Sequence, residues 1–292
     1  MFQSLRELLD GPAPVRAPLV LDPLMARLAE KAGFEAVYLG GGGLGYAKTF
    51  LEANLNASEM AQAGVDIAAA TSLPVVLDGA CGWGDAMHLQ RTIALVEAAG
   101  FAAIELEDQV FPKRAGHHVG EDKTAPPEVL EAKIRSAVAA RRNPDFLIIA
   151  RTNIATSDPD DALRRCEAYR AAGADVLLPA TGAVRDPEVI LDLGRQLGPP
   201  LMFLTPPGGL ANTGLSLGDL HDAGYRLIVD AMSLQLLVYE LLKAGYAELA
   251  SEGFAIQPGR PPEDWWKIVG ELHETIDLDK LLDIEREGAE TR

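Results

Sequence analysis

Short, uniformly apolar runs alternate along this chain with longer segments in which apolar residues recur at helical spacing. Uniformly apolar runs are typical of parallel strands that are covered by helices on both faces of the sheet. The runs are predicted to form eight strands, at residues 17–21, 36–39, 74–77, 101–107, 146–150, 175–178, 200–204 and 226–229. A helical segment follows each strand. Eight strand-then-helix units predict an α/β protein with the (β/α)8 barrel fold.

The helical segments are predicted at 24–32, 58–71, 85–99, 126–142, 159–172, 186–197, 217–223 and 233–251, and Ser58 is the predicted cap of the second. A doubly wound sheet is the alternative arrangement for such a pattern. It would need a phosphate-binding fingerprint directly after its first strand. The glycine run at 40–43 does not match GxGxxG, so the barrel is favoured.

The barrel is predicted to occupy residues 1–256, and a C-terminal extension follows at 257–292. The extension contains the Trp265-Trp266 pair and an apolar segment at 276–287. It is predicted to form two more helices with no strand between them. A barrel does not need these helices, so we expect them to pack against a neighbouring subunit.

Composition restricts the choice of partners. The chain has 292 residues, of which 48% are hydrophobic, and its formal net charge is −17 with a pI near 4.7. Such a surface repels nucleic acid and acidic membranes. An anionic substrate would therefore need a local cluster of cationic side chains or a metal ion.

The cysteine content and the N-terminus predict a cytoplasmic protein. Two cysteines, Cys81 and Cys166, are no disulfide framework and suit a reducing compartment. The N-terminal segment reads as an amphipathic helix without the apolar core of a signal peptide. No apolar stretch is long enough to span a bilayer.

Polar residues follow the predicted strands, at the end where barrel enzymes carry their chemistry. These residues are Asp22, the glycines 40–43, Asp78, Glu107, Asp108, residues 151–153, residues 179–180, Thr205 and Asp230. Several carboxylates thus converge with one arginine, Arg151. Carboxylate oxygens suit a hard divalent ion such as Mg²⁺. The planar fork of Arg151 suits a substrate carboxylate or phosphonate.

Each of these positions also has a structural interpretation. Asp22 could be a helix cap, and Asp78 a turn residue. The glycine run could be a tight turn, or its N–H groups could bind a carboxylate or phosphonate. Cys81 suits a small packed residue better than a nucleophile. Arg151 could belong to a structural ion pair.

A basic, glycine-containing loop follows the carboxylates Glu107 and Asp108 directly. It contains Lys113, Arg114, Gly116, His117 and His118. A basic loop next to buried carboxylates suggests a lid over an anionic ligand. Buried carboxylates are costly unless they bind a metal or a partner.

Five stretches resemble the isocitrate lyase and phosphoenolpyruvate mutase superfamily over nearly the whole chain. They are LDPLMARLAEKAGFEAVYLGGGG, SLPVVLDGACGWGDA, AAGFAAIELEDQVFPKRAGHHVG, FLIIARTN and AAGADVLLPA. The overall similarity is greatest to carboxyphosphonoenolpyruvate mutase-like and 2-methylisocitrate lyase-like members. The resemblance implies a (β/α)8 barrel whose last helix is swapped with a neighbour, usually in a homotetramer. It also implies Mg²⁺ and an enolate-type reaction that makes or breaks a C–C or P–C bond of an α-keto acid, an α-hydroxy acid or a phosphonate.

The resemblance also assigns roles to individual residues. Asp78 matches the aspartate that contacts Mg²⁺, and Glu107 matches a glutamate that holds the waters of the metal. Arg151 matches the arginine that binds the substrate carboxylate. The loop formed by Tyr38, Gly40, Gly41 and Gly42 matches the one that holds the other end of the substrate. The mobile catalytic loop is matched by Lys113, Arg114, Gly116 and His117.

Several positions depart from the family pattern. The lyases carry a cysteine as general acid or base where this chain has Ala115, and alanine has no proton to give. Ala80 replaces the second aspartate of a DxD motif. Ala180 replaces a glutamate, and Glu52 is the nearest candidate for another missing aspartate. These departures favour a mutase, a decarboxylase or a variant lyase. The alternatives are recruited chemistry with His117 or His118 as the acid–base group, or a binding paralogue without catalysis.

Overall fold

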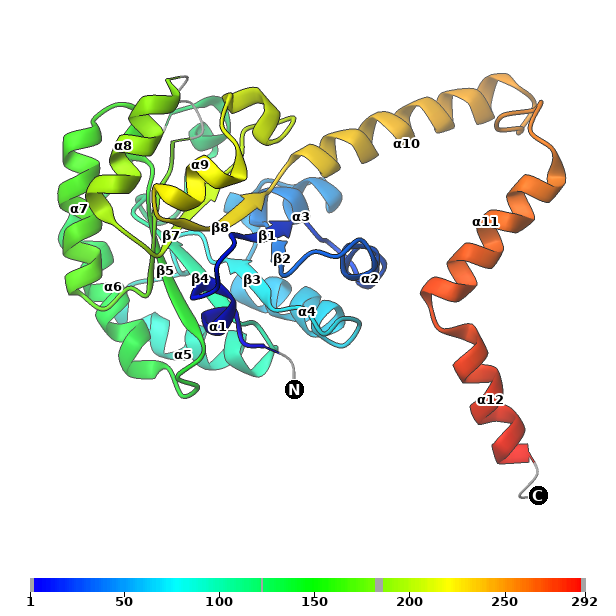
Figure 1. Ribbon diagram of the computed structural model, residues 1–292, viewed down its shortest axis with the longest axis horizontal. Helices are drawn as coiled ribbons and strands as arrows, with labels where there is room; N and C mark the ends of the chain where they lie inside the picture. Colours follow the sequence, from blue (N-terminus) through cyan, green and yellow to red (C-terminus); the bar gives the residue numbers. More distant parts are fainter. Residues whose placement is uncertain (1–2, 122, 182–185, 290–292) are drawn as a thin grey trace. The chain divides into compact units, whose positions relative to one another are not determined.

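Eight parallel strands form a nearly closed barrel with helices between them (Figure 1), so the predicted (β/α)8 fold is confirmed. The computed structural model describes residues 3–121, 123–181 and 186–289. Neighbouring strands pair in the order β1-β8-β7-β6-β5-β4-β3-β2, and a bridge between Leu19 and Tyr38 joins the remaining edges. The strands are β1 (Val15–Pro18), β2 (Val37–Leu39), β3 (Val75–Asp78), β4 (Ala103–Glu107), β5 (Leu147–Thr152), β6 (Val176–Pro179), β7 (Leu201–Leu204) and β8 (Tyr225–Asp230).

Apart from one short helix at residues 41–47, the helices lie where helical spacing predicts them, with small shifts at their ends. They are α1 (Leu5–Leu9), α2 (Pro23–Lys31), α3 (Gly41–Ala47), α4 (Ala57–Ala68), α5 (Ala86–Ala98), α6 (Pro127–Ala140), α7 (Pro159–Ala171), α8 (Pro187–Leu197), α9 (Leu217–Asp222), α10 (Ser233–Ser251), α11 (Pro262–Thr275) and α12 (Leu278–Ala289). The glycine run does not form the tight turn that was one of its two interpretations. It opens the short helix α3, which the sequence did not predict. The predicted cap of α4 is wrong. The cap of α4 is Asn56, not Ser58, because its side chain accepts hydrogen bonds from the backbone N–H groups of Ser58 and Glu59.

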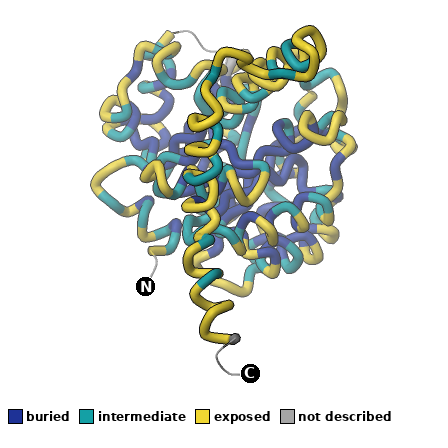
Figure 2. The backbone as a smooth tube through the Cα atoms, turned by 90° about the vertical axis from the view of Figure 1, so that its right-hand side faces the viewer, coloured by how far each residue is buried: buried dark blue, intermediate teal, exposed yellow. Residues whose placement is uncertain are grey.

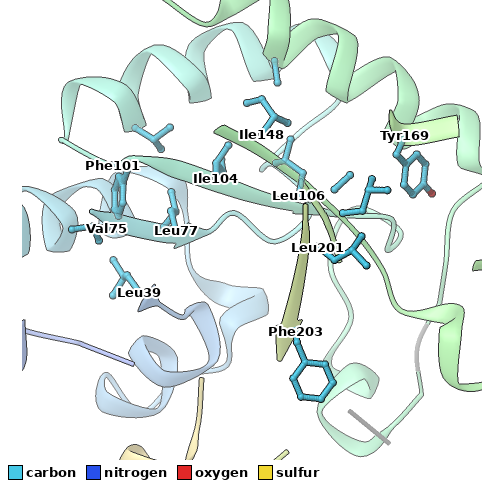
Figure 3. Close-up of a cluster of buried hydrophobic side chains, with 14 of the residues drawn as sticks. Leu39, Val75, Leu77, Phe101, Ile104, Leu106, Ile148, Tyr169, Leu201 and Phe203 are labelled. Carbon is cyan, nitrogen blue, oxygen red and sulfur yellow. The ribbon is translucent and has the colours of Figure 1, made fainter. Parts of the chain in front are cut away.

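Alternation along each strand divides the core into two layers. Outward side chains such as Leu77, Ile104 and Ile148 pack under the helices, in the cluster drawn in Figure 3. Inward side chains such as Val76 and Ile149 fill the barrel together with apolar residues of α1. In Figure 2 the strands are buried within a partly exposed layer of helices. Two side chains that are two residues apart on one strand therefore lie on the same face of the sheet. Where the first points into the barrel, the second does so too.

This alternation positions the chemistry of the barrel mouth. Asp78 on β3 lies in register with Glu105 on β4, and Glu107, two residues beyond Glu105, lies in register with Arg151 on β5. Tyr38 belongs to the interior cluster on β2. The ends of these four strands thus carry polar groups on the inner face of the barrel.

The chain divides into two compact units, residues 1–235 and 236–292. Large apolar side chains of the second unit are exposed, among them Trp266 and Leu272. Within the described residues, no helix is both long and apolar enough to cross a bilayer. The division predicted near residue 256, and the packing of the extension on another subunit, stay predictions.

An ion pair between Arg16 and Glu35 joins β1 to the segment before β2. Glu35 accepts hydrogen bonds from Arg16 Nε at 3.0 Å and Nη2 at 2.5 Å. Burial acts to raise the pKa of Glu35, but these hydrogen bonds lower it below the ordinary value of 4.5. The side chains of Arg16 and Glu35 are 42% and 34% exposed, so solvent screens the ion pair. The pair therefore contributes at most about 1 kcal/mol to the free energy of unfolding.

Replacing Glu35 with glutamine is expected to lower the free energy of unfolding by up to about 1 kcal/mol at pH 7. Because the folded-state pKa lies below the unfolded one, the stabilisation is present above about pH 4.5 and is lost as the pH falls further. Urea unfolding of both proteins at pH 7 and pH 3 tests this. A stability difference that persists unchanged at pH 3 would contradict it.

Candidate active site

A cavity of about 350 Å³ opens at the carboxyl ends of the strands. Residues from the ends of β2, β3 and β5 line one part of it, and residues that follow β6, β7 and β8 line another. Its polar lining residues are Tyr38, Tyr46, Glu52, Asp78, His117, His118, Arg151, Asn153 and Thr205. The position agrees with the place where barrel enzymes carry their active sites.

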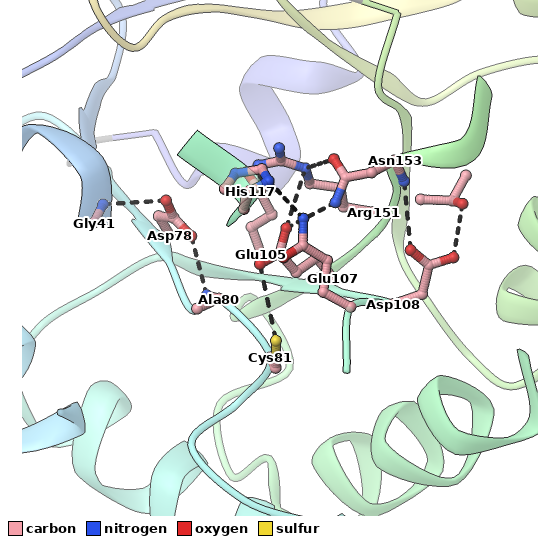
Figure 4. A network of polar contacts seen from close by, with 12 residues as sticks. Gly41, Asp78, Ala80, Cys81, Glu105, Glu107, Asp108, His117, Arg151 and Asn153 are labelled. Atoms are coloured by element: carbon pink, nitrogen blue, oxygen red, sulfur yellow. Dashed lines mark hydrogen bonds and ion pairs between the residues drawn. The ribbon is translucent and has the colours of Figure 1, made fainter. Parts of the chain in front are cut away.

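Arg151 is held in the cavity wall by a network of carboxylates (Figure 4). Its Nη1 donates to Glu105 Oε1 at 2.8 Å, and its Nε donates to Asn153 Oδ1 at 2.8 Å. Asn153 in turn donates to Glu107 Oε2 at 2.9 Å, and Tyr38 donates its hydroxyl to Glu105 Oε2 at 3.0 Å. The guanidinium is thereby oriented by several partners, while its Nη2 donates to no described group.

Lys113 is buried between two carboxylates. Its Nζ lies 2.5 Å from Glu52 Oε1 and 2.6 Å from Glu107 Oε1, and its side chain is only 5% exposed. Burial acts to lower the pKa of Lys113, but Glu107 and Glu52 raise it, so the ammonium stays charged. The predicted lid residue therefore serves in this structure as a counterion deep in the site.

The cluster carries more negative than positive charge. Among the described residues, the carboxylates Glu52, Asp78, Glu105 and Glu107 face two cations, Lys113 and Arg151, which leaves two negative charges uncompensated.

The pKa values reflect this imbalance. Burial and the charge of Asp78 raise the pKa of Glu52 to about 8. Burial, together with Asp78 and against the effect of Arg151, raises that of Glu105 to about 7. Burial also acts on Glu107, but Lys113 and Arg151 lower its pKa to about 2. Part of the cluster thus takes up protons in the absence of a further cation.

Asp78 lies beside the glycine run. Its Oδ2 accepts from the backbone N–H of Gly41 at 3.1 Å and its Oδ1 from that of Ala80 at 3.0 Å. Position 41 must be glycine because a Cβ there would lie 2.5 Å from Glu52 Cγ. Because α3 approaches so closely, Glu52 lies next to Asp78. From the sequence, Glu52 was only the nearest candidate for the aspartate that this chain lacks.

A hard divalent cation fits this donor set. No three of the described His, Cys, Asp or Glu side chains form a ready-made cage. Mg²⁺ does not need one, because it keeps several waters and binds one or two carboxylates. Asp78 and Glu52 face the cavity, Glu107 lies behind them, and the two uncompensated charges match a dication.

The loop after β4 brings both of its histidines to the cavity. His117 Nδ1 lies 2.7 Å from Gln109 Nε2, and His118 Nδ1 lies 3.3 Å from the hydroxyl of Tyr46. Burial, and then His117 and Lys113, lower the pKa of His118. Ala115 is exposed and does not line the cavity.

Cys81 is buried behind the network and does not replace the missing loop cysteine. Its Sγ lies 3.9 Å from Glu107 Oε1. Burial and the Glu107 charge raise the pKa of the thiol to about 12. A thiol that stays protonated beside a carboxylate is a poor nucleophile, which agrees with the packing role predicted for Cys81.

The structure brings together most of the residues singled out from the sequence. Tyr38, Gly40, Gly42, Asp78, His117 and Arg151 line the cavity, and Gly41, Glu107 and Lys113 lie directly behind it. Arg114 and Gly116 do not line it.

Three strand-end aspartates do not line the cavity, contrary to the expected convergence. Asp22 caps α2 by accepting from Met25 N, as the structural interpretation has it. Asp230 accepts from the backbone N–H groups of Met232 and Ser233 at the start of α10. Asp108 points outward to α7.

Sequence reasoning missed Glu105 as a site residue. The signal was available, because Glu105 precedes Glu107 by two residues and must share its face of β4. Tyr46 was also missed. It reaches the cavity from α3, a helix that the glycine-rich sequence did not predict.

Known proteins of one family are similar to this chain in sequence. A family described as phosphoenolpyruvate phosphomutase matches residues 5–250. A 2-methylisocitrate lyase from Aeropyrum pernix is 35% identical over 227 residues, which are 77% of this chain and 72% of that protein. Other relatives are named as a 2,3-dimethylmalate lyase and an oxaloacetate decarboxylase.

Solved structures are similar over nearly the whole chain. A phosphoenolpyruvate phosphomutase from Streptomyces platensis subsp. rosaceus has a TM-score of 0.83 and 29% identity, with 97% of each chain covered. A phosphonopyruvate hydrolase in complex with oxalate and Mg²⁺ has a TM-score of 0.82 and 26% identity, with 96% of each chain covered.

Proposed function

Because this chain belongs to the phosphoenolpyruvate phosphomutase family of enzymes, we propose that it breaks or rearranges a C–C or P–C bond next to the carbonyl or hydroxyl carbon of a small α-keto or α-hydroxy acid. The observation that carries the proposal is Arg151, which is oriented in the cavity beside a carboxylate cluster with two uncompensated charges. This pairing of a guanidinium with a cation site suits a substrate that presents a carboxylate next to a carbonyl oxygen. The reaction is that of a mutase, a decarboxylase or a variant lyase.

The cofactor of the proposed reaction is Mg²⁺, with Asp78 as its direct ligand and Glu107 as a partner of its waters. Glu52 lies close enough to Asp78 to take the second supporting place. A bound divalent cation would supply electrostatic stabilisation of negative charge on the substrate oxygens. The neighbour that holds oxalate and Mg²⁺ supports this assignment.

The protein's own groups orient the substrate and exclude water. Arg151 binds the α-carboxylate through the guanidinium edge that faces the cavity, while Glu105 and Asn153 fix its plane. The phenol of Tyr38 is committed to Glu105, so it shapes the wall and is not free to give its proton to the substrate. Gly40 and Gly42, which line the cavity, let the substrate approach the backbone closely. The loop with Lys113, Arg114, Gly116 and His117 covers the site.

A second candidate chemistry rests on the two histidines at the cavity. Since Ala115 cannot donate a proton, His117 or His118 would be the acid–base group of a reaction other than the family's. A pH–rate profile that is unchanged by both His117→Gln and His118→Gln would exclude this alternative. A profile that loses its ionisation near neutral pH in either variant would favour it.

A panel of keto acids, hydroxy acids and phosphonates tests the proposed function. We expect turnover of at least one member in the presence of Mg²⁺, with products identified by NMR. Removing the metal with a chelator should lower the rate more than about 100-fold, and Mg²⁺ should restore it. Turnover that is undiminished without metal, or no turnover of any member, would overturn the proposal.

We further propose that residues 257–292 pack on a neighbouring subunit in a homodimer or homotetramer, in the cytoplasm. Large apolar side chains of this extension are exposed, which is unusual for a monomer. Light scattering should give a mass above that of one chain. The double change Trp266→Glu and Leu272→Glu should lower it, whereas Lys267→Glu should not. A monomeric wild-type protein would contradict the proposal.

A further inference from the structure

The cavity has two chemically different halves. The ends of β2 to β5 form the half that contains Tyr38, Asp78 and Arg151. The other half is formed by residues at or after the ends of β6 to β8, and its side chains are mostly apolar. It is lined by Ala180, Leu204, Thr205, Pro206, Ala231 and Met232. A ligand anchored at Arg151 therefore extends toward a wall that is almost free of polar side chains.

None of the described residues that line the apolar half carries a positive charge for a second anionic group. Among the described lining residues, Arg151 is the only one with a permanent positive charge. Lys113 is already held by two carboxylates in the opposite half. Asp230 adds a negative charge next to the apolar half. Its position there is shown by the hydrogen bond that its carboxylate accepts from the backbone N–H of Met232 at 3.1 Å. A carboxylate placed here would lose water without gaining a counter-charge.

The hydroxyl of Thr205 does not make the apolar half polar. It is buried and has no hydrogen-bond partner in the part of the chain that the structure describes. Because this oxygen is closed to solvent, it offers a ligand in the cavity no exposed hydrogen-bonding group.

Resting on the proposed function, we propose that the substrate is a 2-keto or 2-hydroxy acid with a single carboxylate and an uncharged, mainly apolar distal group. The carboxylate binds at Arg151 and the metal site. The distal group lies against Leu204, Ala231 and Met232. Such a substrate has neither a phosphonate nor a second carboxylate at the far end, so among the proposed reactions it fits the C–C bond cleavage of a variant lyase.

Binding of two matched acids tests the inference without any need for turnover. 2-Oxopentanoate and 2-oxoglutarate have the same chain and differ only in a terminal methyl against a carboxylate. Calorimetry in the presence of Mg²⁺, with oxalate as a reference ligand for the Arg151 end, should show that 2-oxopentanoate binds at least about tenfold more tightly. Equal affinities, or tighter binding of 2-oxoglutarate, would overturn the inference.

A charge placed on the apolar wall provides the second measurement. Met232→Lys should shift the affinity ratio at least about tenfold toward 2-oxoglutarate, and Met232→Gln, which has a similar length and no charge, should not. Oxalate affinity should stay within about twofold in both variants, which shows that the Arg151 end is intact. A ratio that moves equally in both variants would mean that shape, not charge, selects the ligand, and would overturn the inference.

The two proposals fail in different ways. If oxalate binds but neither 2-oxo acid does, the inference about the substrate is overturned and the proposed function stands. If oxalate also fails to bind in the presence of Mg²⁺, the proposed function is overturned and the inference falls with it.

Discussion

Replacing Asp78 with asparagine is expected to weaken Mg²⁺ binding at least about 100-fold, with a loss of turnover of at least the same size. The substitution keeps the shape of the side chain and removes its charge. Mutation of an outer partner of a metal typically lowers affinity about 10–100-fold, so a direct ligand should reach or exceed the upper end of that range. Calorimetric titration with Mg²⁺ and the rate on the best substrate of the panel measure the two effects.

The matched control for Asp78 is Asp22→Asn. Both aspartates follow a strand, but Asp22 caps α2, and asparagine is as good a cap as aspartate. Metal affinity and turnover of the control should therefore stay within about twofold of the wild type, and its stability should change little. Unchanged Mg²⁺ binding in Asp78→Asn would show that the metal, if the enzyme uses one, is held elsewhere.

Replacing Asp108 with alanine is expected to lower the free energy of unfolding by about 3–5 kcal/mol. The Oδ2 atom of Asp108 accepts from Thr152 Oγ1 at 2.7 Å, from Tyr169 OH at 3.0 Å and from Arg165 Nη1 at 3.1 Å. Alanine would leave three donors without this acceptor, including a guanidinium whose side chain is only 10% exposed. Burial raises the pKa of Asp108, so the orphaned donors, and not the loss of the charge itself, account for most of the expected effect.

Two further variants separate the contributions at Asp108. Asp108→Asn keeps one acceptor oxygen and should lower stability by about 1–2 kcal/mol. Asp85→Asn changes an exposed helix cap and should have almost no effect. Urea unfolding measures all three proteins. Since Thr152 and Asn153 follow Arg151 on the chain and both contact Asp108, we also expect weaker oxalate binding in Asp108→Ala. A loss below about 1 kcal/mol in Asp108→Ala would contradict the role given to this network.

The sequence predicted the strands and helices because a covered parallel sheet requires uniformly apolar strands, and helices require a different period. It also predicted that the chemistry lies at the strand ends, around Asp78, Glu107 and Arg151. It could not tell Asp78 from Asp22, since both follow apolar runs. Whether a strand-end side chain enters the barrel depends on how the eight strands close on one another.

The loop after β4 also separates what the sequence could predict from what it could not. Its residues were recognised as basic and were predicted to cover the site. The sequence could not reveal that Lys113 lies between Glu52 and Glu107, because Glu52 is 61 residues away along the chain. Nor could it reveal Tyr46 at the cavity, since seven residues that include four glycines do not predict a helix.

The sequence by itself thus determined the barrel, the strand-end carboxylates, Arg151 and the loss of the loop cysteine, because these follow from local periodicity and residue type. Only the tertiary structure decided which carboxylates face one another, where Lys113 finds its partners, and that one half of the cavity is apolar. These features depend on contacts between residues far apart in the chain, and local patterns carry no information about such contacts. For this reason the family follows from the sequence, while the chemical class of the substrate is inferred from the cavity.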